Sequence, residues 1–191
     1  ARNTATPVKS ISQAGARGHL DDLEASIKDK LPDLKIRRSE TDVDVYDTRK
    51  ILQFARLLMH AEVSGNTSAA EPLRAYKNPE QCLTEFSTWF VEKDRDKEAR
   101  LKYEFTVQIA PYAIKEYGFW ENHDAWNGHH LWEETKKGGR ACRRDDQNQI
   151  IWVSPGLLFP ILGAMSEFSE KGSDGKWRIK KPKRFKPAEM I

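Results

Sequence analysis

The chain has 191 residues, of which 38% are hydrophobic and 32% are charged, and its formal net charge is +3. This composition is typical of a globular protein with a solvated surface and excludes an intrinsically disordered chain. The length fits one domain with appended segments. No apolar run reaches the roughly 18 to 20 residues that a membrane span requires, so no membrane partner is expected.

The cysteine pattern indicates a reducing environment. Cys82 and Cys142 are far apart in the sequence, and neither lies in a CxxC or Cys/His ligand pattern. Neither a disulfide framework nor a structural zinc site is therefore signalled. Free thiols fit a cytoplasmic protein, and no cofactor is expected.

A mainly α fold is expected, with about five or six helices and two or three short strands. The predicted organisation is an irregular lead-in over residues 1–18, a single helical domain over 19–175 and a basic tail over 176–191. The lead-in is rich in Ser, Thr, Ala and Gly and lacks helical periodicity.

Helical signals begin after the lead-in. Leu20, Leu23 and Ile27 recur at spacings of three and four, which predicts an amphipathic helix over residues 19–31. Pro32 ends it, because proline cannot continue the hydrogen-bond pattern of a helix.

Capping signals predict where the next helices begin. The segment from Ser39 to Asp42 resembles a capping box, so a long central helix is expected from there to about residue 63. Asn78 followed by Pro79 predicts the start of another helix, since Asn caps well and Pro is preorganised at the first helical position.

The later part of the chain contains indications of both helices and strands. Pro111 is expected to kink or divide the helix in which it lies. Residues 117–132 are dense in aromatic side chains and are expected to form an aromatic-walled loop or a short helix pair. Residues 150–153 predict a buried strand, and Ser154 with Pro155 predicts a helix after it.

Three blocks near the N-terminus carry a family resemblance: Arg2–Val8 (RNTATPV), Gly18–Glu24 (GHLDDLE) and Ile36–Gln53 (IRRSETDVDVYDTRKILQ). Together they resemble the bacterial abortive-infection phage-resistance family, AIPR. The chain departs from the family's Asn-x-Gln pattern, because Thr-Ala-Thr follows the first Asn. The resemblance implies a portion of a cytoplasmic phage-defence protein, and it transfers no catalytic residue.

One cluster of histidines and carboxylates could support hydrolysis. Its candidate catalytic residues are His123, Asp124, His129, His130 and Glu133, with Glu134 beside them. Imidazole and carboxylate groups bind metals and perform acid–base chemistry near neutral pH. The spacing matches no metal motif, however, so no metal site is predicted. Packing of the neighbouring tryptophans with locally hydrogen-bonded histidines is the favoured interpretation.

Basic residues gather in two windows. The first contains Lys136, Lys137, Arg140, Arg143 and Arg144, and the second contains Lys176, Trp177, Arg178, Lys180, Lys181, Lys183, Arg184, Phe185 and Lys186. Cations neutralise phosphates, and aromatic rings stack on unpaired bases. DNA or RNA is therefore a candidate partner, while an anionic protein partner or a merely solvated basic surface is also compatible with these windows. The alternation from Trp177 to Lys180 also permits an edge strand that joins the tail to the fold.

The sequence is compatible with three hypotheses for function. The first is a nucleic-acid-binding or phage-defence module without its own catalytic centre. The second is a metal- or histidine-dependent hydrolase, such as a nuclease, built on the cluster from His123 to Glu134. The third is a protein-interaction domain with a protein partner at the aromatic segment 117–132.

Overall fold

The computed structural model describes residues 10–37, 46–65, 78–129, 131 and 141–191, and it is mainly helical, as the sequence predicts. Its helices are α1 (Ser10–Lys30), α2 (Thr48–Leu57), α3 (Ala61–Ser64), α5 (Pro79–Glu92), α6 (Lys97–Glu121) and α7 (Pro155–Met165). Short 3-10 helices lie at η2 (Asp124–Gly128), η3 (Ser166–Phe168) and η4 (Pro187–Glu189). No helix in these ranges is long and apolar enough to cross a membrane.

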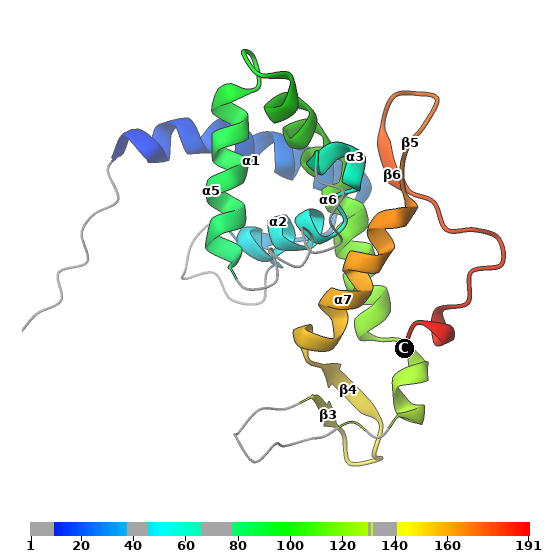
Figure 1. Ribbon diagram of the computed structural model, residues 1–191. Helices are drawn as coiled ribbons and strands as arrows, with labels where there is room; N and C mark the ends of the chain where they lie inside the picture. The colour runs from blue at the N-terminus through cyan, green and yellow to red at the C-terminus, as the bar shows by residue number, and fades with distance from the viewer. Residues whose placement is uncertain (1–9, 38–45, 66–77, 130, 132–140) are drawn as a thin grey trace, which may run out of the picture.

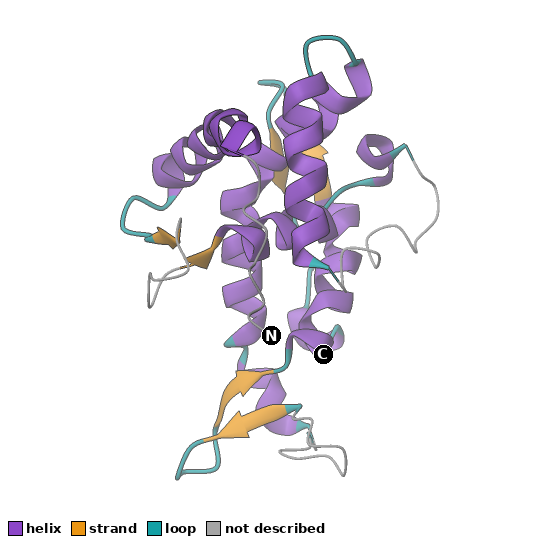
Figure 2. Ribbon diagram, turned by 90° about the vertical axis from the view of Figure 1, so that its left-hand side faces the viewer, coloured by secondary structure: helices purple, strands orange, loops and turns teal. Residues whose placement is uncertain are grey.

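The strands of the described residues form three two-stranded sheets. β1 (Ile36–Arg37) runs parallel to β2 (Tyr46–Asp47). β3 (Cys142–Arg144) is antiparallel to β4 (Ile150–Val153), and β5 (Ser169–Lys171) is antiparallel to β6 (Trp177–Ile179). The β3–β4 hairpin lies at the opposite end of the molecule from the turn between α5 and α6 (Figure 2).

The other helices pack around α6, the long helix at the centre of the molecule (Figure 1). Phe105, Ile109 and Ala113 repeat every fourth residue along α6 and are fully buried, because this spacing places them on one face. The helix runs through Pro111 without being divided. Buried residues flank that proline on both sides, so packing offsets the hydrogen bond that it lacks.

Three expected boundaries were wrong. α1 begins at Ser10, inside the segment expected to be irregular, because Gln13, Ala14 and Ala16 favour a helix. α2 begins at Thr48, because the preceding residues are extended in β2. It ends at Leu57 and not near residue 63, because the extended His60 interrupts the helix and caps the separate α3. The segment from Ser39 to Asp42, which suggested an earlier start, lies outside the described residues.

Asp47 caps α2 instead. Its Oδ1 accepts a hydrogen bond of 2.8 Å from the backbone N–H of Arg49, which satisfies one of the free amides at the helix start. The Arg49 guanidinium binds the Asp47 carboxylate and also that of Glu80 in the first turn of α5. One arginine therefore joins the starts of two neighbouring helices.

Other start signals are confirmed. The Asn78 side chain accepts a hydrogen bond from the backbone N–H of Gln81, and Pro79 is the first residue of α5. Ser154 and Pro155 begin α7 in the same way. β4 forms where a strand was predicted, but it is not buried throughout, since Ile151 is 52% exposed. A two-stranded hairpin can leave one face in solvent.

Both cysteines are free and buried. Burial, aided by the nearby Glu85 carboxylate, raises the pKa of the Cys82 thiol from 9.0 to about 11. As pH rises above 9, an unfolded chain loses this proton before the folded chain does, so the folded state becomes less stable between pH 9 and 11. We expect Cys82 to account for a loss on the order of 2 kcal/mol over this range.

Urea titrations of the native chain and of Cys82→Ala at pH 8 to 11 check this expectation. The native chain should lose more stability than the variant as pH rises. Parallel pH profiles for the two proteins would contradict the assignment.

Candidate nucleic-acid interface

The basic tail begins as part of the fold, in the β5–β6 hairpin. The backbone N–H of Trp177 donates a 2.8 Å hydrogen bond to Oε1 of Gln108 in α6. The Trp177 ring lies 5.1 Å from the Phe105 ring and is 7% exposed. Trp177 therefore anchors the hairpin to α6 and is not available to stack on a base, which corrects its expected role. The predicted edge strand at this point is confirmed as β6.

Phe185 is the second aromatic anchor of the tail. Its ring packs edge-on against Trp120, with centroids 6.0 Å apart, and against Phe168 at 5.4 Å. Because edge-to-face contacts of this kind are favourable, Phe185 holds the tail against the second half of α6. Both tail aromatics that were expected to stack on bases thus have structural contacts.

Between the anchors lies a tight turn, Pro182–Phe185, called here the cationic turn. The backbone N–H of Phe185 donates a 3.0 Å hydrogen bond to the Pro182 carbonyl, which is the pattern of a β-turn. Lys183 and Arg184 occupy the two central positions, and both are exposed. Within the described part of the chain, neither side chain forms an ion pair. The turn therefore presents two cations to solvent.

Four other basic residues of the tail are paired. The Lys180 ammonium lies 3.1 Å from Glu170, and the Arg178 guanidinium lies near Glu170 and Asp174 at 3.9 and 4.0 Å. These pairs are partly or largely exposed, so each contributes little to stability. They nevertheless lower the free positive charge around the hairpin.

Lys186 and Lys181 are also paired, whereas the Lys176 side chain forms no ion pair with any described residue. Lys186 pairs with Glu189 at 2.6 Å, and Lys181 pairs with Glu116 of α6 at 2.8 Å. Lys176 is exposed and next to Asp174, whose carboxylate accepts a hydrogen bond from the Lys176 backbone N–H. This hydrogen bond lowers the pKa of Asp174 below its ordinary value.

The first basic window lies on a different hairpin. Arg143 in β3 is exposed, whereas the Arg144 guanidinium donates hydrogen bonds to the carbonyl oxygens of Asn148 and His129. Arg144 therefore has a structural contact within the β3–β4 region. The predicted residues Lys136, Lys137 and Arg140 lie outside the described residues.

The histidine cluster is only partly described. Nδ1 of His123 accepts a hydrogen bond from the backbone N–H of Ala125 and caps η2. Asp124 is exposed, and exposed His129 lies edge-on to Trp126. No group of three metal-ligating side chains occurs in the described ranges. His130, Glu133 and Glu134 lie outside the described residues, so the hydrolase hypothesis stays a prediction.

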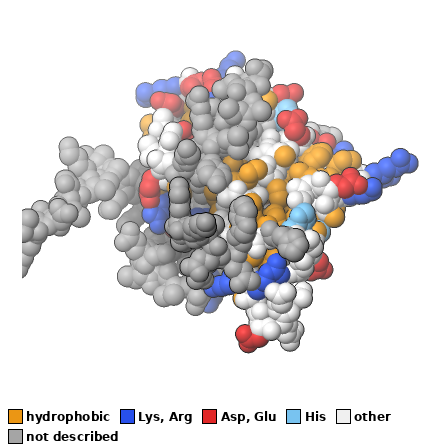
Figure 3. All heavy atoms as spheres, turned by 60° about the horizontal axis from the view of Figure 1, so that its bottom comes forward, with side chains coloured by type: hydrophobic (Ala, Val, Ile, Leu, Met, Phe, Trp, Pro, Cys, Tyr) orange, Lys and Arg blue, Asp and Glu red, His pale blue; other side chains and the backbone are white. Residues whose placement is uncertain are grey.

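The aromatic segment is mostly internal where it is described. Trp120 and Trp126 are buried, and the Trp126 indole N–H donates a 2.6 Å hydrogen bond to the Trp120 carbonyl. Phe119 is 41% exposed. Hydrophobic side chains gather on the face of the molecule that Figure 3 brings forward. α6 continues to Glu121, so the helical alternative for residues 117–132 is correct at its start and a 3-10 helix follows.

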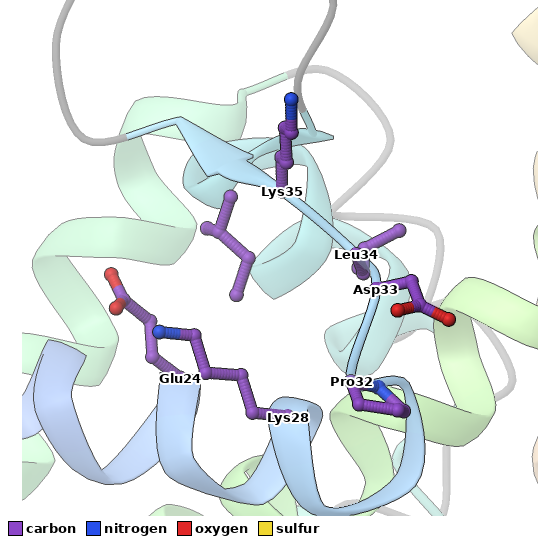
Figure 4. Close-up of a pocket in the computed structure, with 7 residues that line it drawn as sticks. Glu24, Lys28, Pro32, Asp33, Leu34 and Lys35 are labelled. Atoms are coloured by element: carbon purple, nitrogen blue, oxygen red, sulfur yellow. The ribbon is translucent and has the colours of Figure 1, made fainter.

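A separate shallow groove of about 460 Å³ lies between the end of α1 and β1. It is lined by Glu24, Lys28, Pro32, Asp33, Leu34, Lys35 and Ile36. Glu24 and Lys28 project from α1 toward the chain that leads into β1, whereas Lys35 and Asp33 point away from the helix (Figure 4). The two charge signs alternate around this groove, so it has no preference for an anion or a cation.

Comparison with protein-family models, with curated proteins and with solved structures finds no match to the chain. The interpretation of the site therefore depends on its own geometry and charge.

Proposed function

We propose that this chain is a nucleic-acid-binding module of a cytoplasmic phage-defence protein, without its own catalytic centre, and that the cationic turn contacts phosphates. One observation carries the binding proposal: Lys183 and Arg184 lie exposed at the tip of a turn whose flanks are anchored to α6. The phage-defence context depends on the resemblance of the N-terminal blocks to the AIPR family.

The proposed ligand is a duplex contacted through its backbone. Single-strand binding sites gain roughly 1–3 kcal/mol for each base that stacks on an aromatic ring. Trp177 is buried and Phe185 packs on the Trp120 and Phe168 rings, so the tail offers charge without a stacking platform. A duplex has the higher charge density and suits such a surface better.

Salt dependence tests this proposal with a 20-base-pair DNA duplex as the probe. Because the cationic turn presents two cations, we expect log K to fall with log salt with a slope of about −2 if the turn alone contacts phosphates. A tail that used all seven of its basic residues would give a slope of about −6. Fluorescence anisotropy between 25 and 200 mM salt measures the slope.

Matched charge variants identify the surface. Lys183→Met with Arg184→Met should abolish most of the salt-dependent binding. Arg95→Met with Lys97→Met removes the same charge at two exposed positions, one in the turn between α5 and α6 and one at the first residue of α6, so this variant should bind as the native chain does. Equal loss in both variants would contradict the assignment. Equally tight binding to polyglutamate would instead favour an acidic protein partner.

A further inference from the structure

Lys181 differs from the other basic residues of the tail, because it is partly buried. It contacts Glu116, Phe119 and Trp120 of α6 and Phe185 of the tail, and these four residues are called here the box. Its side chain is 26% exposed, and its ammonium is 2.8 Å from the Glu116 carboxylate, which is 12% exposed. The same ammonium lies over three aromatic rings, 4.3 Å from the centroid of Phe119, 5.4 Å from that of Phe185 and 5.7 Å from that of Trp120. All three distances are in the range of cation–π attraction.

The box joins one side of α6 to the tail. Glu116, Phe119 and Trp120 are three and four residues apart in α6, so they lie on the same side of the helix. Phe185 belongs to the tail and also packs on Trp120. Lys181 comes directly before the cationic turn and Phe185 ends it. Both ends of the turn are therefore attached to the same part of α6.

We propose that Lys181 is a positioning residue, which fixes the cationic turn on α6 and does not itself contact phosphate. This inference rests on the proposed function for the role of the turn. A phosphate at the Lys181 ammonium would have to compete with the Glu116 carboxylate and the three rings that already contact it. Lys183 and Arg184 are exposed without a comparable partner in the described ranges, so they can contact phosphates without losing existing interactions.

Hydrogen exchange in the absence of nucleic acid tests the positioning role directly. The amide of Phe185, which donates to the Pro182 carbonyl, should exchange roughly tenfold faster in Lys181→Met, because a partly desolvated cation–π and ion-pair contact is lost. Lys181→Arg, which keeps the charge, should restore most of the protection. Lys180→Met is the matched control, since Lys180 is the adjacent lysine and is 69% exposed; it should leave the Phe185 amide unchanged.

The thermal midpoint of each variant separates a local effect from global unfolding. Lys181→Met should keep the midpoint of the native chain while the Phe185 amide loses protection. Unchanged protection in Lys181→Met would overturn the proposal.

Duplex binding then distinguishes a positioning residue from a phosphate ligand. Lys181→Met should weaken binding several-fold with the salt slope unchanged, because only preorganisation is lost. Lys183→Met should reduce the slope by about 0.9. A similar reduction in Lys181→Met would show that Lys181 contacts phosphate and would overturn the proposal. Failure of the native chain to bind the duplex would refute the proposed function, and exchange at Phe185 would still decide whether Lys181 fixes the turn.

Discussion

Replacing Trp120 by alanine is expected to lower the free energy of unfolding by about 3–5 kcal/mol. The Trp120 side chain is fully buried near the end of α6. Its ring contacts Phe119, His123 and Phe185, so truncation leaves a cavity between α6, η2 and the tail. A loss of this size is a large fraction of the 5–15 kcal/mol that stabilises a typical domain.

Trp120→Phe is the matched control for this expectation. The Trp120 indole N–H is buried and donates no hydrogen bond to any described residue, so phenylalanine removes an unpaired donor while it retains most of the ring. We expect this variant to cost far less than the alanine variant. Urea unfolding followed by circular dichroism measures both, and equal losses would contradict the cavity explanation.

Trp177→Ala is expected to have a similar cost, about 3–4 kcal/mol, and also to weaken duplex binding. The variant removes no cation, so any loss of affinity for the duplex comes from displacement of the cationic turn. Trp177 attaches the β5–β6 hairpin to Phe105 of α6, and the cationic turn follows that hairpin directly. Without this contact the turn loses its fixed place on the helix.

Trp177→Phe should retain most of the binding, because an aromatic ring still fills the space beside Phe105. Anisotropy measurements on the folded fraction of each variant at low temperature separate binding from unfolding. If Trp177→Ala bound the duplex as tightly as the native chain, the hairpin would not position the turn. Stronger binding of single strands than of the duplex would contradict the backbone-contact interpretation.

Local rules predicted the helical fold and several of its boundaries. Asn78 and Ser154 cap helices because their side chains reach amides two or three residues ahead, a relation that depends on sequence spacing alone. The start of α2 was predicted too early, because pairing with β1 holds Tyr46 and Asp47 extended. Such a pairing is a tertiary contact and leaves no local signal.

The candidate site was predictable in composition but not in geometry. The basic residues alone identified the tail as a candidate binding segment, and the alternation from Trp177 to Lys180 indicated its strand. The division of its cations into paired and free residues depends on Glu116 and Glu170, which belong to other elements. The role of Phe185 likewise depends on Trp120 in α6. Sequence spacing contains neither of these long-range contacts.

The attachment of the tail to α6 has a consequence for the entropy of recognition. A disordered basic segment loses conformational freedom when it meets its partner, and this loss opposes binding. In this chain Trp177, Lys181 and Phe185 already restrict the segment during folding. Two cations on such a prearranged support can therefore contribute more to affinity than their number suggests.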